Sequence, residues 1–230
     1  MKIAVLGTGE VGRRLATKLA SLGHEVTIGS RTADNAQARQ WAADNDGAHG
    51  TFADAAGASD LVVNATSGLV SLAVLEAAGA DNLRGKVLID VSNALDFSDG
   101  FPPKVVTPDG GSLAEQLQKA FPETRIVKTL NTMNNTIMVE PSRVPGHHNV
   151  FLSGNDEHAK AEVAALLRSF GWAPAQITDL GDLSSARATE LLMPLWLRLH
   201  GVLGPVDFNI SVASSAVANT NDVRKATLQS

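Results

Sequence analysis

The chain has 230 residues, of which 44% are hydrophobic and 19% are charged. This size and composition predict one large domain, or a main domain with a small appendage, and exclude a disordered or fibrous protein. Acidic residues (24) outnumber basic residues (19), so nucleic acid is not an expected partner, and the lack of cysteine excludes disulfides and thiolate chemistry. We expect a cytoplasmic protein without a membrane span, because no apolar run is long enough for a signal peptide or a transmembrane helix.

The first half of the chain alternates short apolar runs with longer amphipathic stretches, a pattern typical of βαβ units and a parallel sheet. Helices are predicted at about residues 11–22, 33–43, 69–78 and 112–120, and strands at residues 2–6, 25–29, 49–52, 61–64, 86–91 and 124–128. Six strands with intervening helices make a complete Rossmann-type unit. We therefore predict an α/β fold built on a doubly wound parallel sheet, with residues 1–148 as the dinucleotide-binding domain.

The second part of the chain predicts a small α/β appendage. Residues 131–148 show no period and are expected to form a long loop, after which a strand, a helix and a strand are predicted at residues 149–153, 156–170 and 175–179. The chain then forms a long final helix at about 183–203, apolar on most faces and kinked by Pro194. We expect residues 149–230 to serve substrate binding and dimerisation.

A glycine motif follows the first predicted strand directly and begins the first predicted helix. In this motif the first glycine can form the tight turn, the second lets the backbone approach a pyrophosphate, and the third seats the helix against the sheet. Free amides at the start of the helix would then bind the phosphates. The predicted pyrophosphate contacts are Gly7, Thr8, Gly9, Glu10, Val11 and Gly12.

The end of the second predicted strand distinguishes between the two nicotinamide dinucleotides. An NAD enzyme usually carries an acidic residue here, about 20 residues past the glycines, whereas this chain has Ser30, Arg31 and Thr32. Arg31 can bind a 2′-phosphate, and the hydroxyls can donate to it, so residues 1–148 are predicted to bind NADP. The alternative is that Arg31 is a solvated residue at a helix start and Thr32 only its N-cap.

Small polar residues follow the fourth, fifth and sixth predicted strands, where a doubly wound sheet binds its ligand. Their amides and hydroxyls can hold a nicotinamide without adding charge, although the same residue types also occur as ordinary turn and cap residues. The candidates are Ala65, Thr66, Ser67, Asn93, Asn131, Thr132 and Met133.

No Lys, His or Tyr at these strand ends is placed as a proton donor for a carbonyl substrate, so no catalytic residue is assigned. Hydride transfer between two rings needs mainly stacking and exclusion of water, which favours a flavin-like partner. His147 and His148 lack metal-ligand spacing and are interpreted as solvated loop residues, and no metal is predicted.

Two features of the final predicted helix remain open at the level of sequence. Met193 and Trp196 are interpreted as core or dimer surface rather than as cofactor contacts. Arg187 is either a site residue or the partner of Glu190 in a surface ion pair.

These segments together resemble the F420-dependent NADP oxidoreductases, also called NADPH-dependent F420 reductases. The resemblance runs from the first strand to about Val212 and is carried by KIAVLGTGEVGRRLATKLASLGHEVTIGSR, LVVNATSG, KVLIDVSNALDF, KTLNTM and GDLSSARATELLMPLWLRL. It implies NADP, a deazaflavin (F420) over the nicotinamide, a homodimer, and residues 183–187, with Leu183, Ser184 and Arg187 as candidates, closing the acceptor side. The archaeal members carry His-Thr-Ile-Pro where this chain has Asn-Thr-Met-Asn at 131–134, and Ile-Pro-type residues in place of Thr66 and Ser67.

The main hypothesis is therefore an oxidoreductase that transfers a hydride between NADP(H) and F420 or a similar flavin-like ring. One alternative is an NADP-dependent dehydrogenase or imine reductase of a small metabolite, which would need a proton donor and usually a larger second domain. Another is a non-catalytic NADP(H)-sensing module, which would bind the nucleotide without turnover.

Overall fold

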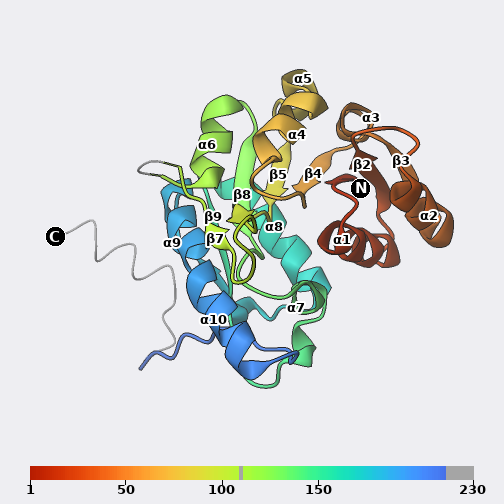
Figure 1. The fold of residues 1–230 in the computed structure, drawn as a ribbon. Coiled ribbons are helices and arrows are strands. Elements are labelled where there is room, and N and C mark those ends of the chain that lie inside the picture. The colour runs from red at the N-terminus through yellow and green to blue at the C-terminus, as the bar shows by residue number, and fades with distance from the viewer. Residues whose placement is uncertain (109–110, 216–230) are drawn as a thin grey trace.

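An eight-stranded sheet with helices on both faces forms the body of the computed structural model, which describes residues 1–108 and 111–215 (Figure 1). The strands in chain order are β1 (Lys2–Leu6), β2 (Glu25–Ser30), β3 (Ala48–Thr51), β4 (Leu61–Asn64), β5 (Val87–Asp90), β8 (Arg125–Thr129), β9 (Val150–Gly154) and β10 (Ile177–Asp179). Their order across the sheet is β10-β9-β8-β5-β4-β1-β2-β3.

The six strands of the first half pair in parallel, and their order, β3-β2-β1-β4-β5-β8, is that of a Rossmann fold. This confirms the predicted doubly wound α/β architecture. The strands of the C-terminal region extend the same sheet. β9 runs antiparallel to β8, with Val127 opposite Gly154, and β10 runs parallel to β9.

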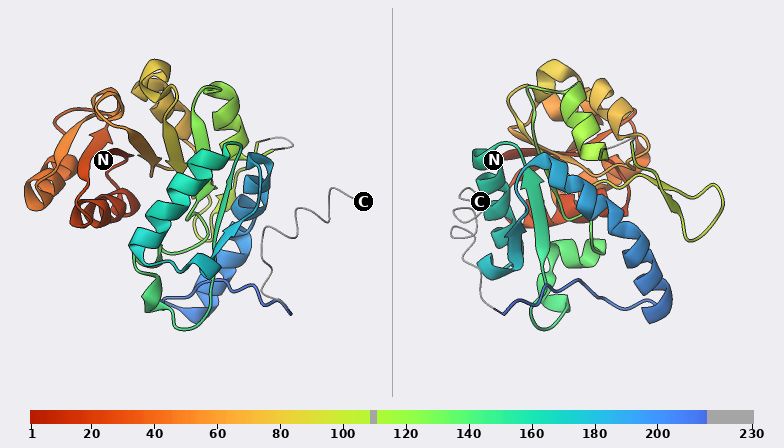
Figure 2. Two further views of the ribbon diagram at one scale, coloured as in Figure 1. Left: turned by 180° about the vertical axis from the view of Figure 1, so that it is seen from behind. Right: turned by 90° about the vertical axis from the view of Figure 1, so that its left-hand side faces the viewer.

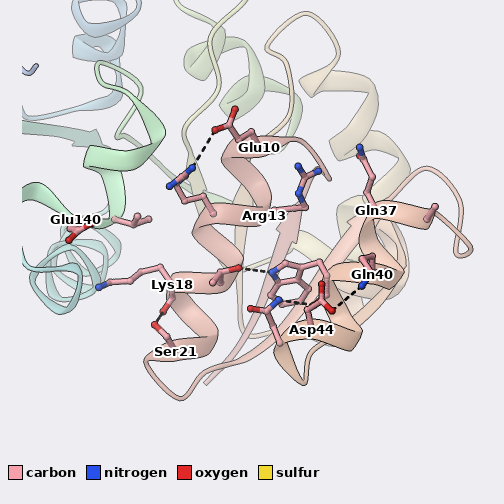
Figure 3. Close-up of a pocket in the computed structure, with 14 residues that line it drawn as sticks. Glu10, Arg13, Lys18, Ser21, Gln37, Gln40, Asp44 and Glu140 are labelled. Atoms are coloured by element: carbon pink, nitrogen blue, oxygen red, sulfur yellow. Dashed lines mark hydrogen bonds and ion pairs between the residues drawn. The ribbon is translucent and has the colours of Figure 1, made fainter. Parts of the chain in front are cut away.

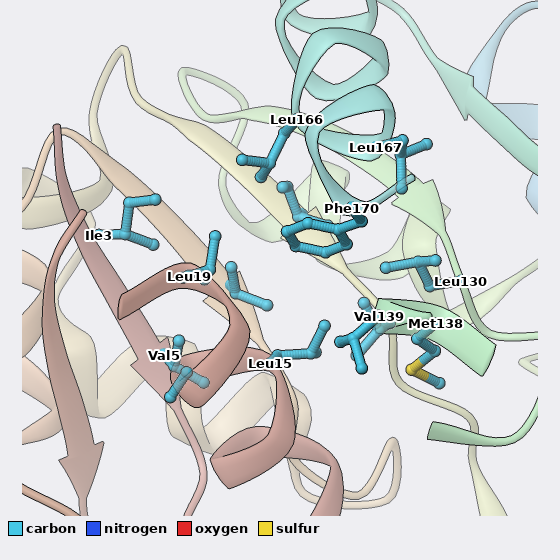
Figure 4. Packing of buried hydrophobic residues seen from close by; sticks show 14 of the residues in the cluster. Ile3, Val5, Leu15, Leu19, Leu130, Met138, Val139, Leu166, Leu167 and Phe170 are labelled. Carbon is cyan, nitrogen blue, oxygen red and sulfur yellow. The ribbon is translucent and has the colours of Figure 1, made fainter. Parts of the chain in front are cut away.

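The alternation of side chains along the buried strands divides the core into two layers. Ile3 and Val5 of β1 face a cluster covered by α1 (Glu10–Ser21), α2 (Ala36–Asn45), α7 (Asn135–Val139) and α8 (Glu157–Phe170) (Figure 4). Ala4 and Leu6 face the opposite cluster, covered by α3 (Phe52–Gly57), α4 (Ser71–Ala78), α5 (Ala80–Leu83) and α6 (Leu113–Ala120). Each fully buried Leu or Ile contributes about 1.5 to 3 kcal/mol through removal from water, so both layers hold the strand ends rigidly.

The final predicted helix is three elements, a 3₁₀ turn η3 (Leu183–Ser185), α9 (Ala186–Leu191) and α10 (Met193–Leu203). Leu192 alone separates α9 from α10, and it keeps helical dihedrals (φ −70°, ψ −21°) and accepts from the amide of Trp196 (3.0 Å). Pro194 lies in the first turn of α10 and has no N–H to donate to the preceding turn, which accounts for the interruption at this point. The predicted interruption at Pro194 is therefore present, in a segment whose backbone stays helical.

After α10 the chain folds back across the start of β9. We call residues 205–212 the strap. The amide of Asn149 donates to the carbonyl of Ile210 (2.8 Å), and the amide of Val212 donates to Oδ1 of Asn149 (2.8 Å). Residues 216–230, part of the predicted C-terminal region, lie outside the described residues.

Several small features were not predicted, among them the short helices α3 and α5. β6 (Leu95–Asp96) and β7 (Lys104–Val105) form an antiparallel pair, and the loop between them projects from the body (Figure 2). The segment predicted as a loop at 131–148 contains α7 and the 3₁₀ turn η1 (Pro141–Arg143); a further 3₁₀ turn, η2 (Pro174–Gln176), precedes β10. In the described ranges, no helix combines the length and apolar character that crossing a membrane requires.

Candidate active site

The glycine motif forms a tight loop between β1 and α1. Gly7 has a φ of 118°, and a side chain there would meet the carbonyl oxygen of Ala65 at 2.7 Å. A Cβ on Gly12 would lie 2.1 Å from the carbonyl oxygen of Gly7, so the helix can approach the loop only because this residue is glycine. At Gly9, in contrast, a Cβ would meet no atom of the described residues within 4 Å, and none of their side chains caps the first turn of α1. Gly9 therefore leaves open space in front of free helix amides.

The loop is held in place by its own helix. The Arg13 guanidinium donates to the carbonyl of Thr8, which brings a positive charge beside the loop, while Glu10 is exposed and pairs with Arg14. Amides at a helix start together with a nearby cation are suited to bind an anion such as a pyrophosphate.

The end of β2 places Arg31 and Thr32 in solvent, whereas Ser30 is buried. Oγ of Ser30 donates to the carbonyl of Thr32 (2.6 Å), so this hydroxyl shapes the turn. Arg31 forms no ion pair within residues 1–108 and 111–215. Its guanidinium is thus available to a ligand at this corner.

A cavity of about 290 Å³ lies where the loop after β1 meets the ends of β4, β5 and β8. One side, which we call the sheet-edge wall, comes from α1 and the strand ends: Val11, Ala65, Thr66, Val91, Ser92, Asn93, Leu95, Asn131 and Met133. The other side, the helical wall, comes from α7, the residue before it, and α10: Asn134, Asn135, Met138, Met193 and Trp196. Six residues predicted from sequence are thus brought together, all on the sheet-edge wall.

Polar groups on the sheet-edge wall are paired with one another. Nδ2 of Asn131 donates to Oδ1 of Asn93 (3.0 Å), and Nδ2 of Asn93 donates to the carbonyl of Asn131 (2.7 Å). This reciprocal pair joins the ends of β5 and β8. Leu130, directly before it, has a φ of 62°, a conformation that costs a non-glycine residue about 1 to 3 kcal/mol. The strained turn directs Asn131 to its partner.

A second network lies beneath the same wall. Asn64, at the end of β4, donates to Oδ1 of Asp90 (2.9 Å) and accepts from Oγ1 of Thr66 (2.7 Å). Oγ of Ser92 also donates to Oδ1 of Asp90 (2.7 Å). The ends of β4 and β5 are therefore fixed together by buried hydrogen bonds.

Lys128 on β8 completes this network with two buried carboxylates. Its Nζ lies 2.8 Å from Asp90 and 3.2 Å from Glu190 of α9, and donates to the carbonyl of Ser92 (2.6 Å). Burial alone would lower the pKa of Lys128, but the two carboxylates outweigh it and hold that pKa above its ordinary value. Glu190 also accepts from the first amides of α6, Leu113 N (2.8 Å) and Ala114 N (3.1 Å).

A larger hollow, of about 880 Å³, lies along the sides of α1 and α2 (Figure 3). Its polar side chains are largely paired locally, as in Trp41 Nε1 to Thr17 Oγ1 (2.9 Å) and Gln40 Nε2 to Asp44 Oδ1 (2.9 Å). Glu10 is the one predicted residue in its lining. The smaller cavity lies where a doubly wound sheet binds ligands, so it is the candidate active site.

Several predicted residues lie away from this cavity. Thr132 is buried, and Ser67 is exposed in the loop after β4. Leu183 is packed in the core, Ser184 lines a separate hollow with α6, and Arg187 is exposed. Residues 183–187 therefore do not line the cavity.

The residues of the helical wall were missed by sequence reasoning. Met193 and Trp196 were interpreted as core or dimer surface, and Asn135 fell within a segment predicted as loop. The apolar run around Pro194 was the available signal, because it includes both Met193 and Trp196.

Two interpretations are corrected. Glu190 is buried and pairs with Lys128 rather than with Arg187. His148 is buried, not solvated: its Nε2 lies 3.1 Å from the carbonyl of Pro141, and its Nδ1 lies 2.9 Å from Nδ2 of Asn209. In the described residues there is no group of three or more histidines and carboxylates that could hold a metal.

Comparison with known proteins identifies several similar chains. Residues 2–94 match a family profile described as NADP oxidoreductase, coenzyme F420-dependent. A crystal structure of a candidate F420-dependent NADP reductase from Arthrobacter sp. FB24 is 52% identical, with a TM-score of 0.88, covering 93% of this chain and 100% of that one. An F420-dependent NADP reductase from Methanothermobacter thermautotrophicus is 32% identical over 213 residues, covering 87% of this chain and 89% of that protein.

A longer relative is also similar. The rat protein Metalloreductase STEAP3 is 32% identical over 205 residues, which cover 85% of this chain. The chain spans 38% of the length of that protein, so the similarity concerns one part of it.

Proposed function

The chain belongs to the F420-dependent NADP reductase family, and from this premise we propose that it transfers a hydride between NADP(H) and the deazaflavin coenzyme F420. The observation that carries the proposal is the cavity at the ends of β4, β5 and β8, open beside the glycine loop and lined by uncharged residues.

The residues around the glycine loop fit a bound dinucleotide. The space in front of Gly9 and the uncapped first turn of α1 can take the pyrophosphate, and Arg31 stands exposed where a 2′-phosphate would lie. Ser30 supports this corner indirectly, by holding the turn. These features support NADP over NAD. When bound, NADPH would supply the hydride.

The lining of the cavity supports transfer between two rings. Its described residues include no Lys, His, Tyr, Asp or Glu, so reduction of a carbonyl or an imine would lack a proton donor. Val11, Met133 and Met138 instead offer apolar surface on which a ring can stack and from which water is excluded. The paired amides of Asn93 and Asn131 fix the strand ends against which the nicotinamide would lie.

We also propose a homodimer, formed through α10 and the loop between β6 and β7. These adjoining elements expose several large apolar side chains, among them Phe97 (57% exposed), Phe101 (62%), Leu195 (53%) and Val202 (75%). A second copy of the chain would cover this surface. The dimer predicts twice the chain mass by light scattering, and Val202→Glu should shift the mass towards that of one chain. A single-chain mass for the unmodified protein would contradict it.

The proposed location is the cytoplasm, because a chain without cysteine needs no oxidising compartment.

Turnover with purified protein tests the hydride-transfer proposal. NADPH is mixed with F420, and in parallel with FMN, and oxidation of NADPH is followed together with bleaching of the deazaflavin. We expect turnover with F420. Tight binding of NADPH without turnover with either acceptor would contradict the proposal and favour a sensing module.

A further inference from the structure

The helical wall of the cavity contains two buried polar atoms without a hydrogen-bond partner in the described part of the chain, Nε1 of Trp196 and Oδ1 of Asn135. Buried polar groups are paired in the great majority of cases, because an unpaired group gives up its hydrogen bonds to water without replacement. Two such atoms in the lining of one cavity indicate that a ligand supplies the missing partners.

The two walls differ in this respect. On the sheet-edge wall the amides of Asn93 and Asn131 bind each other, and the hydroxyl of Thr66 donates to Asn64. That wall can receive a nicotinamide with its polar groups already satisfied. The unpaired atoms lie on α7 and α10, on the opposite side, where the second ring of a hydride-transfer pair would lie.

The chemistry of the two atoms defines what they can recognise. The indole N–H of Trp196 can only donate a hydrogen bond, and Oδ1 of Asn135 can only accept one. A complementary ligand therefore carries both a hydrogen-bond acceptor such as a carbonyl oxygen and a donor such as an N–H. The pyrimidinedione edge of deazaflavins and flavins has this arrangement, whereas a quinone has carbonyls but no N–H.

The strap contacts Trp196 directly and contacts the residue next to Asn135. Trp196 stacks on Phe208 of the strap at 5.4 Å between ring centroids, and on His200 at 5.3 Å. Asp207 of the strap accepts from Oγ1 of Thr136 (2.8 Å), the residue after Asn135. One segment thus orders the side chain of α10 and the helix α7, so that little freedom would be lost on binding.

We propose that Trp196 and Asn135 are the residues that select the hydride partner, by binding the carbonyl and the N–H of a pyrimidinedione ring edge. This inference rests on the proposed function. It assigns the recognition of the ring to the helical wall and leaves the nucleotide to the glycine loop and the sheet-edge wall.

Binding experiments separate this role from activity. The dissociation constant of F420 is measured by its fluorescence with protein saturated with NADP⁺, which prevents turnover, and that of NADPH is measured separately. Trp196→Phe keeps an aromatic ring, although a smaller one, and removes the N–H; Asn135→Leu keeps the approximate volume and removes the acceptor. Trp41→Phe is the matched control, because Nε1 of Trp41 binds Thr17 outside this cavity.

We expect Trp196→Phe and Asn135→Leu each to weaken F420 binding about five- to tenfold, the loss typical of one buried hydrogen bond, with NADPH binding within about twofold of wild type. Trp41→Phe should change neither constant. Unchanged F420 binding in the two variants, while the wild type binds and reduces F420, would overturn the inference and leave the proposed function standing. If the variants weaken binding of NADPH and not of F420, these residues bind the nicotinamide amide, and the inference is overturned as well.

A measurement on the unmodified protein tests the inference even if the variants do not fold. With NADP⁺ bound, 5-deazariboflavin should bind at least about fivefold more tightly than its N3-methyl derivative, which lacks the N–H. Equal binding of the two would contradict the role of Asn135. If the wild type neither binds nor reduces F420, the proposed function itself fails.

Discussion

The two walls of the cavity use polar residues in different ways. The amides and hydroxyls of the sheet-edge wall form hydrogen bonds within the protein. These bonds join the ends of β4, β5 and β8 into a rigid platform. On the helical wall, Trp196 Nε1 and Asn135 Oδ1 have no hydrogen-bond partner among the residues that the structure describes. This difference supports the proposal that one wall provides shape for a cofactor common to many Rossmann folds, while the other recognises a particular partner.

The largest expected effect concerns the platform beneath the sheet-edge wall. Lys128→Met would leave Asp90 and Glu190 as buried carboxylates without their cation, so the free energy of unfolding should fall by about 3 to 5 kcal/mol in urea titrations. At neutral pH, Lys128 should contribute fully to the free energy of unfolding. Because its pKa is raised in the folded protein, this stabilisation is lost only when the pH rises through the folded-state pKa.

The exposed Arg84, which pairs with Asp81 and Glu123, provides the control for this variant. Arg84→Met should hardly change stability, because water screens exposed ion pairs. Equal stability losses in the two variants would show that the buried network is no more important than a surface pair.

The next effect separates binding of the nucleotide from folding. Gly9→Val places a side chain in space that the protein leaves open, so NADPH should bind at least about a hundredfold more weakly, about 2.7 kcal/mol, at an unchanged melting temperature. Gly12→Ala, which forces a Cβ against the carbonyl of Gly7, should instead lower the melting temperature. Normal NADPH affinity in Gly9→Val would disprove the assignment of the pyrophosphate to this loop.

A smaller effect concerns the choice of dinucleotide. Arg31→Glu replaces an exposed cation by an anion at the end of β2, so affinity for NADPH should fall about ten- to a hundredfold while affinity for NADH stays nearly constant. Titration of NADPH and NADH into the wild type and the variant measures the ratio of the two affinities. Equal losses of affinity for both nucleotides, or no loss for either, would contradict a 2′-phosphate site at the end of β2.

The smallest effect concerns the strap that supports the helical wall. Burial alone would raise the pKa of Asp207, but hydrogen bonds from Thr136 and Arg143 outweigh it and hold that pKa below its usual value. The stabilisation is therefore complete above about pH 4 and is lost as the pH falls through the folded-state pKa. Asp207→Asn should lower the melting temperature slightly at pH 7 and not at strongly acidic pH. A difference that grows in acid would contradict this role.

The dinucleotide-binding part of the fold could be predicted because its sequence signals are local. A buried strand such as 61–64, a glycine loop and a helix start are each encoded within a few residues, and in a doubly wound sheet their order brings the strand ends together. Thr66, Asn93 and Asn131 could thus be assigned to one edge from sequence. The exact partner of each amide could not, because it depends on the strained turn at Leu130.

The helical wall could not be predicted because long-range packing creates it. An apolar helix with Met193 and Trp196 is compatible with a core, a dimer or a site, and only the packing of this helix beside α7 and the strand ends decides among them. The same holds for Glu190, whose partner Lys128 is distant in sequence and lies in a strand that reads as ordinary core. The antiparallel pairing of β9 with β8 likewise leaves no local signature.

The most direct test of the central claim follows the hydride itself. NADPH that carries deuterium at its transferable position is incubated with F420 and the protein, and the reduced deazaflavin is analysed by mass spectrometry. We predict that deuterium appears on the carbon of the deazaflavin ring that receives the hydride, because in the proposed arrangement the hydride passes directly from one ring to the other. Reduced F420 that contains only solvent hydrogen, or no reduction at all, would contradict the account.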